Sequence, residues 1–179
     1  MAIRGQTVLA VIPARGGSKR VPKKNGRVFK GRMLFSWTID AGLKSKYIDR
    51  LIFSSDEMEW ISIASIACDS IVRPAELATD DATCEDVIRH ALQIFPADWV
   101  VLLQPTSPNR TAADIDACIE RAQLGHGCIS TYMGKTNGAV YVATKEWLTE
   151  HDFSHMGLCK YEMEESHSLD INEPEDFEK

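Results

Sequence analysis

Hydrophobic residues along the chain follow two alternating patterns: short continuous runs, and longer segments with helical spacing. Residues 7–13 (TVLAVIP), 50–54 (RLIFS) and 99–103 (WVVLL) are largely apolar runs. Runs of this length with many β-branched side chains predict strands that are buried on both faces. Shorter runs predict further strands at residues 128–131, 139–143 and 158–163.

Segments between these runs carry apolar side chains at the spacing of an amphipathic helix, at residues 34–43, 58–67, 82–95 and 112–123. Three of them are preceded by residues that favour helix N-termini. The expected N-terminal residues are Ser55 or Asp56 for the second helix, Asp80, Asp81 and Thr83 for the third, and Thr111 with Asp114 for the fourth. A last helix is expected to begin within residues 173–179.

Strands and helices that alternate with short connections predict an α/β fold, with an open, mostly parallel, Rossmann-like sheet flanked by helices. No internal repeat or linker-like stretch interrupts the pattern, so we expect a single domain over residues 1–179. Ligands of such sheets bind beyond the carboxyl ends of the strands. The residues that follow each strand are therefore the first candidates for a site.

Composition narrows the class of protein. The chain is 44% hydrophobic and 26% charged, with a net charge of -6, which is typical of a globular protein. The acidic balance argues against a nucleic-acid binder, and no apolar run approaches the ~20 residues of a membrane span. Five widely spaced cysteines, none in a CxxC motif, indicate free thiols in a reducing compartment. No signal-peptide cleavage site is evident, so we expect a cytoplasmic protein that binds neither nucleic acid nor membrane.

Positive charge is concentrated near the N-terminus although the chain as a whole is acidic. No Asp or Glu precedes Asp40, whereas residues 15–32 contain eight Lys or Arg residues. The two glycines of ARGGSK allow a tight turn whose N–H groups approach an anion. Arg15, Lys19 and Lys24 would neutralise a polyphosphate there. The spacing fits neither the Walker loop nor GxGxxG, and a glycine turn followed by solvated lysines would give the same pattern.

The segment IPARGGSKRVPKKN (residues 12–25) resembles the opening motif of the acylneuraminate cytidylyltransferases, which make CMP-activated sialic acids and related nonulosonates. The resemblance continues in the family's order through SKYIDRLIFSSD (45–56), RPAELATDDAT (73–83), VVLLQPTSPNRTAADID (100–116), NGAVYV (137–142) and SLDINEPEDFEK (168–179). These six stretches span nearly the whole chain. The resemblance implies a fold of the nucleotide-diphospho-sugar transferase type.

The resemblance also implies a role for individual residues. The residues implied to hold the nucleotide are Ala14, Arg15, Gly16, Gly17, Ser18, Lys24 and Asn25 at the triphosphate, and Arg73, Asp80 and Thr83 at the cytidine. Those implied to hold the sugar are Gln104, Arg110 and Lys135, and those implied to ligate Mg²⁺ are Asp170 and Asn172. Arg15, Lys24 and Asp170 would be the catalytic residues of this set.

The implied reaction is nucleotidyl transfer from CTP to an acidic sugar. The anomeric hydroxyl of a 2-keto-3-deoxy sugar acid attacks the α-phosphate, and pyrophosphate leaves. Such a transfer depends on positioning and on neutralisation of charge. Mg²⁺ suits this role because it prefers oxygen ligands and takes few protein carboxylates.

Departures from the family pattern leave alternatives open. The final motif is usually D-x-D, but here it is Asp170-Ile171-Asn172, so an amide oxygen replaces a charged ligand. Most family members carry several dozen residues before NGAVYV that dimerise and reach into the partner's site, whereas only YMGKT (132–136) stands here. We therefore expect a monomer or a non-standard homodimer. The alternative functions are a catalytically impaired CTP-binding module and a 3-deoxy-octulosonate cytidylyltransferase.

Overall fold

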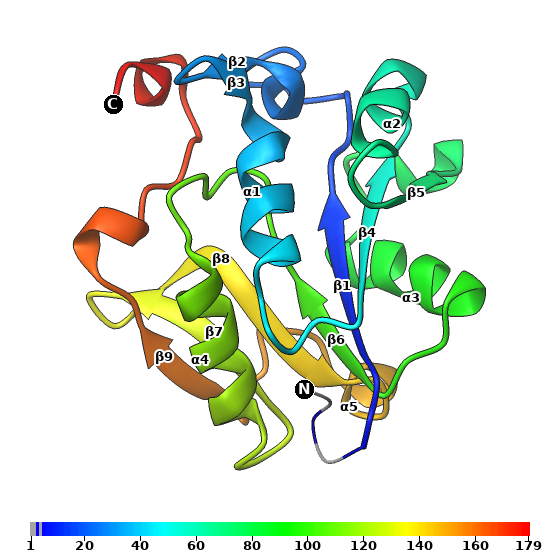
Figure 1. Cartoon of the computed structure of the whole chain (residues 1–179), viewed down its shortest axis with the longest axis vertical. Coiled ribbons are helices and arrows are strands. Elements are labelled where there is room, and N and C mark those ends of the chain that lie inside the picture. Colours follow the sequence, from blue (N-terminus) through cyan, green and yellow to red (C-terminus); the bar gives the residue numbers. More distant parts are fainter. Residues whose placement is uncertain (1–2, 4) are drawn as a thin grey trace.

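A mixed seven-stranded sheet forms the centre of the computed structural model, which describes residues 3 and 5–179 (Figure 1). Its strand order is β5-β4-β1-β6-β8-β7-β9, and among these described strands β8 alone is antiparallel to its neighbours. The strands are β1 (Val8–Pro13), β4 (Arg50–Ser55), β5 (Asp69–Val72), β6 (Trp99–Leu102), β7 (Gly127–Tyr132), β8 (Lys135–Thr144) and β9 (Cys159–Glu162). The predicted open, mostly parallel α/β sheet is confirmed.

Helices cover both faces of the sheet. One face packs against α1 (Leu34–Leu43), α2 (Met58–Ala64) and α4 (Ala112–Ala122). The other packs against α3 (Cys84–Ile94) and α5 (Trp147–Glu150). Short 3-10 turns complete the chain as η1 (Lys24–Gly26), η2 (Ala75–Leu77), η3 (Glu165–His167) and η4 (Pro174–Glu178). No helix of the described residues is long and apolar enough to cross a membrane.

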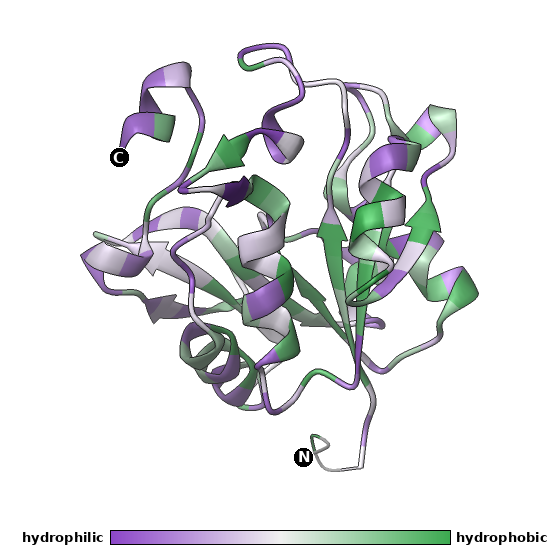
Figure 2. Ribbon diagram, turned by 45° about the horizontal axis from the view of Figure 1, so that its top comes forward, coloured by the Kyte–Doolittle hydropathy of each residue, from purple (hydrophilic) through white to green (hydrophobic). Residues whose placement is uncertain are grey.

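The central strand β1 shows why its sequence is a continuous apolar run. Successive side chains of a strand point to opposite faces. Ala10 and Ile12 therefore enter the core on one face, whereas Leu9 and Val11 enter the core on the other. All four are at most 1% exposed, so each position of the strand must be apolar. In Figure 2 the central strands are accordingly largely green, and purple residues lie on the loops and outer helix faces.

The predicted helix N-termini are confirmed at two helices and wrong at a third. Thr83 begins α3 and Thr111 begins α4, each in a reciprocal capping box with the Asp three residues later. The N-cap of α2 is Glu57 rather than Ser55 or Asp56, and its side chain makes no capping bond. Asp56 instead accepts a hydrogen bond from the backbone N–H of Gly16, at 2.9 Å.

The structure adds elements that the pattern did not predict. β5 is a four-residue edge strand, and β2 (Val28–Phe29) pairs with β3 (Arg32–Met33) in a small separate hairpin. The helix expected at the end of the chain is the single 3-10 turn η4. This C-terminal end lies beside the hairpin, above the carboxyl ends of the parallel strands (Figure 1), and Phe177 contacts Phe29 with ring centroids 6.3 Å apart.

Candidate active site

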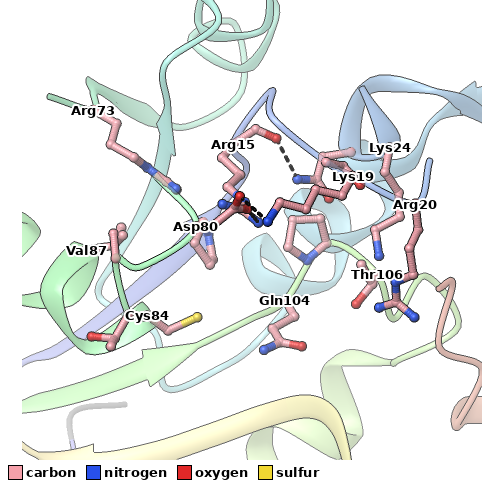
Figure 3. Close-up of a pocket in the computed structure, with 16 residues that line it drawn as sticks. Arg15, Lys19, Arg20, Lys24, Arg73, Asp80, Cys84, Val87, Gln104 and Thr106 are labelled. Atoms are coloured by element: carbon pink, nitrogen blue, oxygen red, sulfur yellow. Dashed lines mark hydrogen bonds and ion pairs between the residues drawn. The ribbon is translucent and has the colours of Figure 1, made fainter. Parts of the chain in front are cut away.

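A pocket of about 460 Å³ opens beyond the carboxyl ends of β1 and β6 (Figure 3). It is lined by residues from three stretches that are distant in the sequence, 13–25, 73–87 and 104–106. These are Pro13, Arg15, Ser18, Lys19, Arg20, Lys24, Asn25, Arg73, Asp80, Ala82, Thr83, Cys84, Val87, Gln104, Pro105 and Thr106. The pocket therefore brings together most of the residues predicted to hold the nucleotide.

The wall of the pocket after β1 is strongly cationic. Arg15 and Lys19 both contact the carboxylate of Asp80, at 2.8 Å and 2.6 Å, as Figure 3 shows. The Lys19 ammonium, and after it the Arg15 guanidinium, holds the pKa of Asp80 below its usual range. Arg15 also donates to the backbone carbonyl of Thr79, at 2.8 Å. One carboxylate thus bridges two of the cations that a polyphosphate would meet.

Lys24 and Asn25 follow in η1 and have different surroundings. Lys24 is partly buried, and its Nζ donates to the backbone carbonyl of Ile171 at 2.9 Å. Burial lowers the pKa of Lys24, and the nearby Asp170 carboxylate opposes that shift. Asn25 is 7% exposed and donates through Nδ2 to the carbonyl of Arg15, at 3.0 Å. Asn25 therefore holds the loop that presents Arg15.

The glycine turn is fixed by close approach to the start of α2. A Cβ on Gly16 would lie 2.2 Å from Glu57 Oε1, whereas a Cβ on Gly17 would meet nothing within 4 Å. The N–H of Gly16 is bonded to Asp56, and the buried Ala14 donates its N–H to the carbonyl of Ser54 at 2.9 Å. Neither N–H is free for an anion in this arrangement, so side-chain cations dominate the site.

Arg73 and Thr83 line the opposite side of the pocket. Arg73 is 5% exposed and donates to the Ser54 hydroxyl and carbonyl, at 3.3 Å and 2.9 Å. Burial lowers the pKa of Arg73 to about 10, which leaves the guanidinium charged at neutral pH. The Thr83 hydroxyl donates to Asp86 Oδ2 at 2.8 Å within the capping box of α3.

A second pocket, of about 380 Å³, adjoins the first and shares Gln104 and Cys84 with it. Its remaining lining residues are Glu85, Leu102, Thr136, Tyr141, Phe153 and Ser154. Gly138, with φ +77°, lies close to Gln104, because a Cβ there would be 2.8 Å from Gln104 Oε1. Burial raises the pKa of Tyr141 to about 12, and the charges of Cys84 and Asp170 act in the same direction.

The structure does not bring Arg110 or Lys135 into either pocket. Arg110 is 3% exposed, and its guanidinium donates to the carbonyls of Ala139 and Gln104, at 2.6 Å and 3.1 Å, and to the Thr38 hydroxyl at 2.6 Å. Burial lowers its pKa to about 9. Arg110 therefore holds the strand end that presents Gln104, and Lys135 is an exposed residue at the start of β8.

Asp170 lies beside the cationic wall with its neighbour Asn172. Asn172 Nδ2 donates to Asp170 Oδ2 at 2.6 Å, and Asn172 Oδ1 accepts from Arg20 at 3.2 Å. Asp170 Oδ1 is buried and has no hydrogen-bond partner within the described residues. A buried carboxylate oxygen without a partner suits a cation, whereas the Asn172 oxygen is already engaged.

The described residues contain no group of three His, Cys, Asp or Glu side chains that could hold a metal by themselves. Mg²⁺ commonly takes one or two protein carboxylates and completes its shell with water and substrate phosphates. Asp170, together with a nucleotide phosphate, fits that mode of binding, but it does not form a site independent of substrate.

Several lining residues were not among the predicted site residues. Arg20 belongs to the basic run, and its contact with Asn172 could have been suspected only from the fold, because 152 positions separate the two. Cys84 and Thr106 follow predicted site residues and enter the pocket through the local course of the chain. No residue-type signal distinguishes them in the sequence.

A cationic pocket at the carboxyl edge of an open α/β sheet, with an acidic residue from the end of the chain beside it, is suited to an anionic ligand at the place where sheets of this class bind their ligands. The chain belongs to the cytidylyltransferase family: the family described as "Cytidylyltransferase" matches residues 9–150. The resemblance to the acylneuraminate cytidylyltransferases is thereby confirmed.

A curated relative is similar over almost the whole chain. The N-acylneuraminate cytidylyltransferase of Escherichia coli O18:K1:H7 (strain RS218 / NMEC) is 31% identical over 212 aligned positions, which include 96% of this chain and 50% of the relative. The chain thus spans about half the length of the curated relative. The aligned positions outnumber the 179 residues of this chain, so the relative carries additional residues within the matched region.

Solved structures confirm the fold class. A CMP:2-keto-3-deoxy-manno-octonic acid synthetase complexed with CTP has a TM-score of 0.79 and 12% identity, and the match covers 96% of this chain and 95% of that one. The manganese complex of Rv0371c from Mycobacterium tuberculosis H37Rv has a TM-score of 0.71 and 15% identity, with 97% and 96% covered. At these identities the likeness shows the fold alone.

Proposed function

We propose that this chain transfers CMP from CTP to a nonulosonic (sialic-type) acid, with release of pyrophosphate. The observation that carries the proposal is the placement of four cations, Arg15, Lys19, Arg20 and Lys24, around one pocket at the carboxyl edge of the sheet. Membership of the cytidylyltransferase family supports CTP as the nucleotide. The name of the E. coli relative supports an acylated nonulosonic acid as the acceptor.

The triphosphate would lie along the cationic wall. Arg15 offers two parallel N–H donors to phosphate oxygens, whereas Lys19 and Lys24 act as point charges. Bound phosphate would replace the Asp80 carboxylate as the partner of Arg15 and Lys19. The charge that develops on the leaving pyrophosphate is stabilised by cations already held in place, which is the main catalytic need of this reaction.

The nucleoside would occupy the side of the pocket formed by Arg73 and the first turn of α3. Arg73 is held by Ser54 and is nearly buried, so its guanidinium has a fixed position for a carbonyl oxygen of the base or a ribose hydroxyl. Thr83 is likewise held by its capping box. Fixed donors of this kind reduce the entropy that binding must remove.

The sugar acid would occupy the adjoining pocket, where Gln104 lies between it and the nucleotide. Its anomeric hydroxyl oxygen attacks the α-phosphorus, the bond to the pyrophosphate oxygen breaks, and the hydroxyl proton passes to solvent. Gln104 would orient the sugar through hydrogen bonds. The lining residues of this pocket suit the hydroxyl and acyl groups of such a sugar through Tyr141, Ser154 and Phe153.

A divalent cation would bind at Asp170 together with the phosphates, and we propose Mg²⁺. When bound, the ion supplies charge neutralisation at the α-phosphate. The unpartnered, buried Asp170 Oδ1 supports this placement. Asn172 Oδ1 could act as a second ligand only if Arg20 released it.

A CTP-binding module without transfer is the second candidate function. The engagement of Asn172 with Arg20 favours it, because the amide oxygen of Asn172 is then occupied and Asp170 is the residue of this motif left to meet the metal. The two candidates differ in what they release. The module would bind CTP and leave pyrophosphate at background, whatever sugar acid is added.

The test is pyrophosphate release from CTP and Mg²⁺ with a panel of nonulosonic acids and 3-deoxy-octulosonate, alongside calorimetric binding of CTP. We expect release with a nonulosonic acid, and none in the presence of a chelator. CTP binding without release on any acid would support the module instead. Release with 3-deoxy-octulosonate alone would keep the enzyme class and change the substrate.

A further inference from the structure

The segment that carries Asp170 runs from Met163 to Asn172, and we call these residues the strap. Apart from the short turn η3 it has no regular structure. It crosses from the end of β9 to the cationic wall, where Lys24 bonds the carbonyl of Ile171. The position of Asp170 therefore depends on how this irregular segment is anchored.

Backbone contacts anchor the strap at its two ends. The N–H of Met163 donates to the carbonyl of Thr131 at 2.8 Å, and the N–H of Ile171 donates to the carbonyl of Thr106 at 2.7 Å. Ile171 is fully buried in a small cluster with Phe29 and Leu34. These contacts hold the ends, and the seven residues between them depend on other anchors. The Ile171 amide exchanges only when it is released from Thr106, so its exchange reports how firmly the strap as a whole is held.

The middle of the strap is held by a side-chain contact with the start of α4. His167 Nδ1 lies 3.0 Å from Asp114 Oδ2, and Tyr161 OH donates to Asp114 Oδ1 at 3.3 Å. Asp114 is only 3% exposed, and it also closes the capping box of Thr111. We call the contact between His167 and Asp114 the clasp.

The clasp joins a nearly buried carboxylate to a segment with little regular structure. A buried carboxylate that loses a partner is left with an unmet hydrogen-bonding demand, so Asp114 favours the docked position of His167. In the absence of the ring, the middle of the strap would keep the bond from Asn109 Nδ2 to the carbonyl of Ser166 at 3.0 Å and the bond from Asn137 Nδ2 to Ser168 Oγ at 3.3 Å. It would also keep the hydrogen bond between Tyr132 and Glu165 and the packing of Leu169 against the cluster of Ile171.

Asp170 lies three residues beyond His167 and is not among the lining residues of either pocket, but its charge reaches a residue of each. Its charge acts on Lys24, which lines the nucleotide pocket, and on Tyr141, which lines the adjoining one. A shift of about 1 Å in a positioned catalytic group can lower a rate by about a hundredfold. The anchoring of the strap therefore bears directly on the reaction.

We infer that His167 is a positioning residue, whose contact with the buried Asp114 locks the strap and thereby fixes Asp170 beside the cationic wall of the nucleotide pocket. This inference rests on the proposed function for its catalytic consequence. The locking of the strap itself is a property of the fold, and it is measurable without any reaction.

The experiment compares three variants of the whole chain. His167→Ala removes the clasp, and His167→Asn restores an amide N–H close to the place of Nδ1. His126→Ala is the matched control, because His126 is an exposed histidine that stacks on Trp147, away from both pockets. Amide hydrogen exchange at Ile171, steady-state pyrophosphate release and CTP affinity are measured for each.

We expect His167→Ala to speed exchange of the Ile171 amide at least about tenfold while the amides of β1 keep their protection. The kcat should fall between about tenfold and a hundredfold, with CTP affinity within about twofold of the starting protein. His167→Asn should recover most of both effects, and His126→Ala should change neither.

Unchanged exchange at Ile171 in His167→Ala would overturn the clasp, whatever the activity shows. Faster exchange without a change in kcat would overturn the link between the strap and catalysis. If the starting protein releases no pyrophosphate, that result contradicts the proposed function, and the part of the inference that concerns catalysis falls with it. The exchange data then still decide whether the clasp locks the strap.

Discussion

At the scale of the residue, the site depends on a few side chains whose neighbours decide their role. Arg73 and Arg110 are both buried arginines near the strand ends, yet one lines the pocket and the other holds backbone carbonyls beneath it. Asp80 bridges Arg15 and Lys19, so an acidic residue holds these two cations together where they would meet phosphate. Residue type alone does not separate these roles.

Lys24→Ala should weaken CTP binding and lower turnover together, because Lys24 is a partly buried cation on the pocket wall. A second variant, Lys24→Arg, separates the effect of the positive charge at this position from the effect of the shape of the side chain. Burial lowers the pKa of Lys24, so raising the pH from neutral towards about 10 should remove its charge and weaken CTP binding. Lys24→Arg stays charged over that range and should flatten the dependence. Equal slopes of CTP affinity against pH in both proteins would remove Lys24 from the triphosphate site.

Asp170 and Asn172 give a paired prediction on the metal. Asp170→Asn should abolish metal-dependent turnover, because it removes the charge of a carboxylate whose buried Oδ1 has no hydrogen-bond partner among the described residues. Asn172→Asp should lower the Mg²⁺ concentration needed for half-maximal turnover, since a second charged ligand strengthens the site. It should also enlarge the rise in Tm that Mg²⁺ and CTP produce together. The same Mg²⁺ requirement in Asn172→Asp and in the starting protein would exclude residue 172 from the metal site.

At the scale of the element, the turn η1 is held in place by the helix behind it. A Cβ on Gly26 would lie 2.4 Å from the indole ring of Trp60, which is 4% exposed in α2. Gly26→Ala should therefore displace the turn that carries Lys24, cost about 1–3 kcal/mol of stability through overpacking, and weaken CTP binding. Urea unfolding and calorimetry would measure both. Gly125→Ala, whose Cβ meets only Cys159 Sγ at 3.9 Å, is the control for stability. Equal free energies of unfolding in the two variants would contradict the steric argument.

The elements also show how far the sequence could predict the structure. Strands buried on both faces and helices with capping boxes were predictable, because their patterns are local, as at β1 and at Thr111. β5 was missed because a four-residue edge strand, DSIV, has one buried side chain and gives no apolar run. The N-cap of α2 was misjudged because Asp56 is bonded to the glycine turn instead, a contact between residues 40 positions apart.

In the candidate site, residues assigned to the triphosphate line the pocket, whereas two of the three residues assigned to the sugar line neither pocket. Arg15, Ser18, Lys24 and Asn25 all line the pocket. Arg110 does not, because its guanidinium is held by carbonyls that only the fold brings together. Arg20, which was not predicted, also lines the pocket and contacts Asn172 near the end of the chain. Long-range pairings of this kind are not encoded in spacing or residue type.

At the scale of the whole molecule, one sheet carries the apolar cores on both of its faces. We propose that the chain is a single folding unit, as expected for residues 1–179. Trp60 and Trp99 belong to the first core and Trp147 borders the second, so fluorescence reports on both. Urea unfolding followed by fluorescence and by far-UV circular dichroism should give coincident transitions. Two separated transitions would show that the two faces unfold independently.

The shape of the whole molecule also bears on its assembly. The resemblance implies that most acylneuraminate cytidylyltransferases carry a dimerising segment before the stretch that matches NGAVYV. In this chain, β7 and β8 are joined at that place by a tight turn at Met133 and Gly134. We propose a monomer or a homodimer formed through another surface. Light scattering over a range of protein concentrations distinguishes the two, and either mass is compatible with a pocket built from one chain.

The central claim is that CMP is transferred covalently to an acid sugar in the pocket at the carboxyl edge of the sheet. The most direct measurement is mass spectrometry of the products after incubation of the protein with CTP, Mg²⁺ and each nonulosonic acid. We expect a CMP–sugar conjugate for at least one acid, less of it with Lys24→Ala, and none with Asp170→Asn at matched protein concentration. Absence of any conjugate with the starting protein, although CTP binds, would contradict it.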